Sequence, residues 1–230
     1  MPRFFAEIHR FPLAVIEGRD SIRHISGPLR KRQGDELAIR IGSQGYRARI
    51  SSLTPRKIEL EIMGEETLRD RSPAAVHLAM CLIDLKDMDD TVRSATELGV
   101  SQIQPLICAR SNIRNVTQAR LARWRSIILE AVKQCDRRSI PEIREPMPLQ
   151  AYAATSPPPA ATRLVAHREA ERSLVEFRGG DCIILIGPEG GLSEDEMRLL
   201  TQSGFIPVGL GGTTLRAATA AVSALSILGC

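Results

Sequence analysis

The feature that most constrains the fold is a regular alternation of strand-like and helix-like segments after about residue 73. Apolar runs predict buried strands at "AAVHLAMCLI", "VSQIQPLIC", "RLVAH", "DCIILIG" and "FIPVGLG". Between and after them, helices are predicted at "DMDDTVRSATELG", "ARLARWRSIILEAVKQC", "EDEMRLLTQSG" and "AATAAVSALSIL". Gly99 is placed to end the first of these helices. Such alternation predicts an α/β domain, a parallel sheet with helices on both faces.

Residues 1–70 have a different pattern. The stretch "DELAIRIGSQGYRARISSLTPRKIELEIM" alternates apolar and polar residues with a period of two, which is typical of half-buried strands. Thr54-Pro55-Arg56 predicts a turn within it. Short strands with tight turns favour a small β-barrel. The charged segment "GEETLRDRS" follows, so the predicted domains are residues 1–70 and 73–230.

Composition narrows the class of protein. Hydrophobic residues make up 43% of the 230 residues, yet no apolar run reaches the roughly 20 that a membrane helix needs. The start, "MPRFFAEIHR", lacks the apolar stretch of a signal peptide, so a cytoplasmic protein without membrane contact is expected. The five cysteines are widely spaced and odd in number. They are therefore expected to be reduced and buried, with neither a disulfide framework nor a metal site.

Positive charge is concentrated in two blocks. Residues 19–57 hold ten basic and three acidic residues, and residues 110–144 hold nine basic and three acidic ones. The first block is expected on short strands and turns, where its side chains project freely. Either these blocks are solvated surface or they meet a polyanion. The abundance of arginine favours nucleic acid, because the planar guanidinium suits phosphates and base edges.

Glycine-rich segments follow two of the strongest predicted strands: "IGPEGGL" at 186–192 and "LGGTTLR" at 210–216. Ligands of open α/β sheets bind at the carboxyl ends of strands, so these segments are either ordinary tight turns or places where a ligand approaches the backbone. On the second interpretation, a Cβ added at Gly190 is expected to fill ligand space.

The residues that follow the first glycine loop argue against a phosphate. Neither a terminal Gly-Lys-Ser/Thr nor the GxGxxG pattern is present. Ser193 and Glu196 form a predicted capping box, and Glu194 and Asp195 add negative charge at the helix start. The loop therefore suits a neutral or cationic ligand, such as an adenosyl sulfonium. The last helix begins with very small residues, which allow close packing against a neighbour or a ligand.

These motifs together resemble the RsmE family of SPOUT-class methyltransferases, over nearly the whole chain. The specific pieces are "ELGV" (97–100), "EAVKQCDRRSIPEI" (130–143), "LIGPEGGLSEDE" (185–196) and "LGGTTLRAATAA" (210–221). "RFF" (3–5) and "PLRKRQGDEL" (28–37) resemble the family's PUA-like RNA-binding β-barrel. The resemblance implies methylation of N3 of a uridine in 16S ribosomal RNA, with S-adenosylmethionine as cofactor. It also implies a deep trefoil knot in the C-terminal sheet and a homodimer.

The resemblance also implies site residues. Cofactor contacts are expected at His167, Ile186, Gly187, Glu189, Gly190, Gly191, Leu192, Leu210, Gly211, Leu215, Thr219 and Ala220. RNA contacts are expected at Arg3, Arg23, Arg30, Lys31, Arg32, Arg110, Gln134, Arg137 and Arg138. Arg216 is expected to orient the substrate, and Glu189 either accepts the uridine proton or supports the loop. The identity of the general base stays open.

The chain departs from the family pattern at several positions. Gly212-Thr213 stands where Pro-Arg is usual, Ala218 where Glu is usual, Arg168 where Pro or Glu follows the histidine, and Ser94 where Lys is usual. Two alternatives remain open at this point: a catalytically weakened RNA-binding or ribosome-assembly protein of the same fold, and a nucleotide-binding oxidoreductase on a doubly wound sheet.

Overall fold

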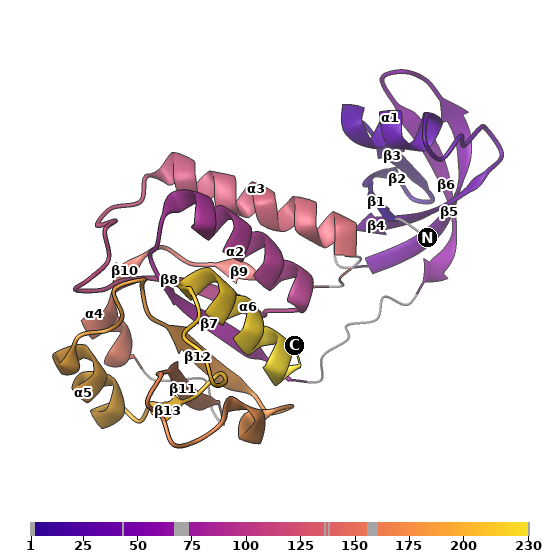
Figure 1. The fold of residues 1–230 in the computed structure, drawn as a ribbon. Coiled ribbons are helices and arrows are strands. Elements are labelled where there is room, and N and C mark those ends of the chain that lie inside the picture. Colours follow the sequence, from indigo (N-terminus) through magenta and orange to yellow (C-terminus); the bar gives the residue numbers. More distant parts are fainter. Residues whose placement is uncertain are drawn as a thin grey trace. The chain divides into compact units, whose positions relative to one another are not determined.

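The computed structural model of the chain describes residues 3–42, 44–66, 74–135, 137, 139–155 and 161–229 (Figure 1). Contacts divide it into two compact units, residues 1–70 with 132–139, and residues 71–131 with 140–230. The predicted boundary between residues 70 and 73, and the predicted RNA-binding residue Arg138, lie outside the described residues. The division into functional domains therefore stays a prediction.

The first unit is built on a six-stranded sheet that curls into a half-barrel (Figure 1). Its order is β1-β4-β5-β6-β3-β2. The strands are β1 (Arg3–Phe5), β2 (Glu7–Arg10), β3 (Leu13–Ile16), β4 (Glu36–Ile41), β5 (Gln44–Leu53) and β6 (Ile58–Glu66). Alternate residues of β6, such as Ile58, Leu60 and Ile62, are buried, as the period of two predicts. The predicted Thr54 turn is confirmed, since Thr54 N–H donates to Lys57 O at 2.9 Å.

One helix of this unit differs from the sequence interpretation. The first basic block was expected on strands and turns, but Arg19–Ser26 form helix α1. Ile22 and Ile25, three residues apart, are buried on one face of that helix. The helix is short and strongly polar elsewhere, so this spacing was its only signal.

The second unit contains the predicted parallel sheet. Its order is β10-β8-β7-β12-β11-β13, with β9 also paired to β8, and every pairing is parallel. The strands are β7 (Val76–Cys81), β8 (Gln102–Ile107), β9 (Glu142–Ile143), β10 (Met147–Pro148), β11 (Thr162–Ala166), β12 (Cys182–Ile186) and β13 (Ile206–Val208). All five residues of β12 are buried, as befits a central strand covered on both faces.

Helices cover both faces of this sheet, which confirms the predicted architecture (Figure 1). On one face lie α2 (Leu85–Leu98), α3 (Gln118–Cys135) and α6 (Ala217–Leu228); on the other lie α4 (Leu149–Ala153) and α5 (Glu194–Gln202). Gly99 ends α2 in the left-handed conformation, as predicted. The short elements α4, β9, β10 and the 3-10 helix η1 (Leu174–Phe177) were not predicted, because they are too short to show a periodicity. Within the described ranges, no helix has the length and apolarity to cross a membrane.

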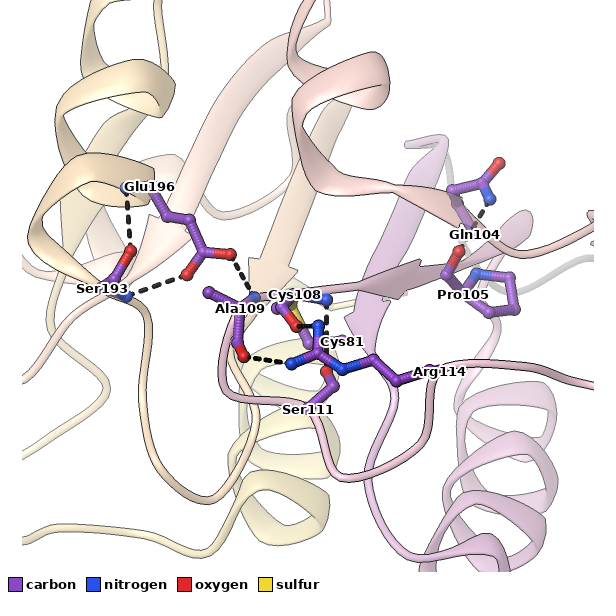
Figure 2. Close-up of a disulfide and its surroundings, with 9 residues drawn as sticks. All are labelled: Cys81, Gln104, Pro105, Cys108, Ala109, Ser111, Arg114, Ser193 and Glu196. Atoms are coloured by element: carbon purple, nitrogen blue, oxygen red, sulfur yellow. Dashed lines mark hydrogen bonds between the residues drawn. A yellow bond between two sulfur atoms is a disulfide. The ribbon is translucent and has the colours of Figure 1, made fainter.

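Two of the cysteines contradict the expectation that all five are reduced. Cys81 and Cys108 form a disulfide (Figure 2). They lie 27 residues apart in sequence, but β7 and β8 are parallel neighbours whose register sets Cys81 opposite Leu106, two residues from Cys108. Sequence spacing alone carries no information about this proximity. Cys182 remains a buried thiol, and burial, with a smaller contribution from Asp181, raises its pKa to about 11, so it is protonated at neutral pH.

Candidate functional site

Three loops of the second unit meet at one edge of its sheet. β11 pairs in parallel with both β12 and β13, so the carboxyl ends of these strands, Ala166, Ile186 and Val208, lie at the same edge. The following segments are 167–169, the glycine loop 187–192 and the second glycine segment 209–216. This is the edge at which open α/β sheets bind ligands.

A pocket of about 480 Å³ lies among these loops. This volume falls in the range of small-molecule sites. The lining residues are Ala166, His167, Arg168, Glu169, Ile186, Gly187, Pro188, Glu189, Gly191, Leu192, Thr214, Leu215, Arg216, Ala217 and Ala220.

Most of the predicted cofactor residues fall on this lining. Among them are His167, Ile186, Gly187, Glu189, Gly191, Leu192, Leu215 and Ala220. The lining does not include Gly190, Leu210, Gly211 or Thr219. Thr219 lies on the exposed side of α6, because one residue along a helix turns by about 100° from the buried Ala220. The predicted orienting residue Arg216 does line the pocket, at the start of α6.

Six lining residues are not among the predicted site residues: Ala166, Arg168, Glu169, Pro188, Thr214 and Ala217. Pro188 and Thr214 lie inside the two glycine-rich segments, so membership of those segments was an available signal. Ala217 lies three residues before Ala220 and shares its helix face. Nothing in the sequence pattern pointed to Glu169.

The glycine loop is closed by its own hydrogen bonds. Gly191 N–H donates to Pro188 O at 2.8 Å, and Gly191 has a φ of +71°, which favours glycine. The predicted capping box is confirmed: Glu196 N–H donates to Ser193 Oγ at 3.2 Å, and Ser193 N–H donates to Glu196 Oε2 at 2.9 Å. The first turn of α5 is thus satisfied and acidic, and it would repel a phosphate.

Gly190 lies against the side chain of Arg110. A Cβ built there lies 3.4 Å from Cβ and 3.6 Å from Cδ of Arg110. The missing side chain of Gly190 therefore makes room for Arg110, and the expectation that a Cβ would also enter ligand space stays a prediction. The sequence correctly indicated that a group lies close to the backbone at this glycine. That group is the side chain of Arg110, from another part of the chain.

The pocket lining combines charged groups of both signs with an apolar surface. Two carboxylates, Glu169 and Glu189, line it together with two arginines, Arg168 and Arg216, and with His167. Glu189 is exposed, and one of its oxygens lies 3.5 Å from the Asp84 backbone nitrogen. The apolar lining comes from Ile186, Leu192, Leu215, Ala217 and Ala220. Among the residues described, no group of three or more His, Cys, Asp or Glu side chains is arranged to hold a metal ion.

The predicted RNA-binding residues of the first unit are mostly exposed. Arg23, Arg30 and Arg32 are exposed, and Lys31 is half-buried, on α1 and in the segment after it. Arg3 belongs to β1, but its side chain lies outside the described part. Arg40, in the same basic block, is only 3% exposed and donates to Gly42 O and Arg137 O. The expectation that side chains of this block project freely is therefore wrong for Arg40.

The second basic block is largely engaged in internal contacts. Arg120 and Arg123 pair with Asp89, and Arg114 donates to the carbonyl groups of residues 108 and 109. Arg110 is exposed, and its guanidinium donates to Gly190 O at 2.9 Å. Gln134 is exposed on α3, and Arg137 donates to Ser139 Oγ at 3.1 Å. Charge counting could not separate such structural arginines from surface ones.

Comparisons with known proteins show the family of the chain. A family model described as an RNA methyltransferase domain matches residues 70–229. The ribosomal RNA small subunit methyltransferase E of Aquifex aeolicus is 31% identical over 231 residues, covering 98% of this chain and 97% of that protein. The protein of the same name from Buchnera aphidicola subsp. Schizaphis graminum is 29% identical, covering 98% and 93%.

Solved structures show the same fold. A crystal structure of ribosomal RNA small subunit methyltransferase E from Neisseria gonorrhoeae bound to S-adenosyl methionine matches with a TM-score of 0.85 and 29% identity, covering 98% of this chain and 95% of that chain. A putative methyltransferase from Legionella pneumophila, in complex with the same cofactor, matches with a TM-score of 0.83 and 29% identity, covering 98% and 96%.

Fold, pocket and family model together define the chain as an RNA methyltransferase. Within this class, the chain belongs to the ribosomal RNA small subunit methyltransferase E (RsmE) family. The resemblance indicated by the motifs is thereby confirmed, and so is the α/β fold class. The knot and the homodimer stay predictions.

Proposed function

We propose that the protein transfers a methyl group from S-adenosylmethionine to N3 of a uridine in 16S ribosomal RNA. The observation that carries this proposal is the pocket built by the three strand-end loops, which offers backbone groups, apolar walls, two carboxylates and two arginines. The acidic, capped start of α5 beside it disfavours a phosphate there. The cofactor in the Neisseria and Legionella structures, and the names of the relatives, support the choice of ligand and substrate.

The residues present fit this cofactor. Ile186, Leu192 and Leu215 supply apolar contacts for an adenine, while Glu169 and Glu189 supply negative charge for a cationic centre. When bound, S-adenosylmethionine supplies an electrophilic methyl group. Holding the acceptor in line with that methyl is a large part of such catalysis.

Uridine N3 carries a proton that must leave as the methyl arrives. Arg216 lines the pocket and is exposed, and in the described structure its side chain makes no capping hydrogen bond to α6. Its guanidinium is therefore available to orient the uracil and stabilise the developing negative charge. Glu169, Glu189 and His167 are the lining groups that could accept a proton, directly or through water.

Binding of the cofactor is tested by titration calorimetry on Gly191→Val. A β-branched residue at a φ of +71° forces the loop out of its shape, so we expect loss of S-adenosylmethionine binding. Gly204→Val is the matched control, because Gly204 also has a positive φ (+86°) and open space but lies outside the pocket lining. Equal cofactor affinity in the two variants would contradict the proposed site.

The same titration on the wild-type protein separates the alternatives. Binding of S-adenosylmethionine together with methylated RNA product supports the enzyme. Binding of RNA without methyl transfer favours the weakened RNA-binding protein. This alternative arises because Gly212, Thr213 and Ala218 depart from the family pattern. Binding of a dinucleotide instead would favour the oxidoreductase.

We propose that the first unit contributes RNA affinity rather than chemistry. Replacing Arg30, Lys31 and Arg32 together by alanine removes up to three phosphate contacts, so the slope of log K against log salt should fall by up to about three units. Cofactor affinity should not change. A control that replaces Arg93, Arg172 and Arg198 removes the same charge from arginines already paired with acids. An equal change of slope in this control would contradict a specific role of the N-terminal residues.

We also propose a homodimer with α6 at or near the contact, and a cytoplasmic location that gives access to ribosomal RNA. The support is the half-exposed small-residue surface of α6, including Ala218, Val222 and Ser223, together with the family. Light scattering at micromolar concentration should give twice the 25.3 kDa of the chain. A mass equal to one chain would refute the dimer.

A further inference from the structure

The segment between β8 and α3, residues 108–114, is a compact loop held by its own side chains (Figure 2). Arg114 donates to Cys108 O at 2.9 Å and to Ala109 O at 2.6 Å. Cys108 N–H donates to the Oγ of the buried Ser111 at 3.2 Å. The disulfide to Cys81 fixes the start of the loop to β7. The loop is therefore well ordered by local contacts, and we call it the brace loop.

The brace loop contacts the glycine loop and the start of α5. Ala109 N–H donates to Glu196 Oε1 at 2.6 Å (Figure 2). Glu196 is only 2% exposed, and its other oxygen accepts from Ser193, so this one carboxylate joins the brace loop to the helix start. Arg110 donates to Gly190 O at 2.9 Å and lays its aliphatic stem against Gly190. None of these brace-loop residues lines the pocket.

This arrangement has a consequence for ligand binding. A loop with three glycines loses more backbone entropy than most when it is ordered. If that ordering is already present before the ligand arrives, the ligand does not have to supply it, and affinity rises. The described polar contacts that hold the loop from outside are the bond from Arg110 to Gly190 O, the longer one from Asp84 N–H to Glu189 at 3.5 Å, and, beyond the end of the loop, the bond from Ala109 N–H to Glu196.

We infer that Arg110 is a positioning residue, which preorganises the glycine loop for S-adenosylmethionine without touching it. This inference rests on the proposed function. It also assigns to Arg110 a primary role different from the RNA contact that its place in the basic block suggested.

The test compares Arg110→Ala, Arg110→Lys and Arg114→Ala with Arg198→Ala, an exposed arginine of α5 paired with Asp195. Calorimetry without RNA should show the cofactor Kd rising about tenfold for Arg110→Ala, as expected for loss of a hydrogen bond from a charged donor. Arg110→Lys should recover part of the affinity, because an ammonium can also donate to Gly190 O. Arg114→Ala should weaken binding in the same direction by loosening the brace loop. Arg198→Ala should leave Kd unchanged.

Kinetics and RNA binding complete the test. For Arg110→Ala, KM for S-adenosylmethionine should rise while kcat at saturating cofactor stays within about twofold. The reason is that the ordered loop binds the cofactor equally well in the ground state and in the transition state, so its loss weakens binding without slowing the chemical step. An unchanged cofactor Kd in Arg110→Ala, with or without weaker RNA binding, would overturn the inference. The wild-type titration is run first. If the wild-type protein does not bind the cofactor, the proposed function itself fails. If the wild-type protein binds it and Arg110→Ala does not weaken that binding, only the role of Arg110 is refuted.

Discussion

Replacement of Arg216 by alanine should reduce methyl transfer at saturating RNA and cofactor by about a hundredfold, the usual cost of removing a preorganised donor from a developing negative charge. Arg216 lines the pocket as the N-cap residue of α6, and it is exposed. Cofactor affinity should change little, because the apolar and backbone contacts of the pocket remain. The measurement is single-turnover methylation alongside calorimetry.

Raising the pH provides a second readout for the same variant. If Arg216 stabilises uridine as its N3 proton leaves, then a higher pH favours the deprotonated base and should recover part of the lost rate in Arg216→Ala. Arg168→Ala is the matched control: Arg168 also lines the pocket, but Glu169 lies 3.2 Å away and partly neutralises it. Equal losses in both variants would indicate a general effect of pocket charge and contradict a specific role for Arg216.

The features that could be predicted from the sequence are those that depend on patterns of neighbouring residues. The buried run at β12, the period of two in β6 and the left-handed Gly99 each follow from the backbone needs of a few neighbouring residues. The capping box at Ser193 and Glu196 is equally local, and the structure confirms it. The parallel sheet was also predicted, and it sets the ends of β11, β12 and β13 at one edge, where a ligand was expected.

The features that were missed depend on contacts between distant segments. Cys81 and Cys108, and likewise Arg110 and Gly190, are brought together only by the packing of neighbouring strands and their loops. Charge counting treated Arg40 like its exposed neighbours, although the fold buries it against two carbonyl groups. A glycine motif shows that something approaches the backbone, but it does not show whether that group is a ligand or another part of the chain.

Asp89 is another residue whose role depends on contacts between distant segments. We expect its replacement to have the largest effect on stability. This carboxylate of α2 is 7% exposed and lies against three donors of α3. It accepts from Arg123 Nε at 2.7 Å, from Trp124 Nε1 at 2.9 Å and from Arg120 at 3.2 and 3.3 Å. Removing it leaves a buried indole N–H and a half-buried guanidinium without their acceptor.

Asp89→Ala should therefore destabilise the second unit by about 1–3 kcal/mol, the cost of leaving the buried Trp124 N–H without its acceptor, since Arg120 and Arg123 are exposed enough to be solvated. Trp124 is the single tryptophan of the chain and is fully buried, so its fluorescence during urea unfolding reports on this unit. Asp90→Ala is the control, because the adjacent Asp90 is exposed and its pair with Arg93 should contribute under about 1 kcal/mol. Similar unfolding midpoints for the two variants would show that Asp89 does not hold α2 to α3. A large separation, with an unchanged slope, would show that two of the arginines counted as RNA-binding charge serve the fold instead.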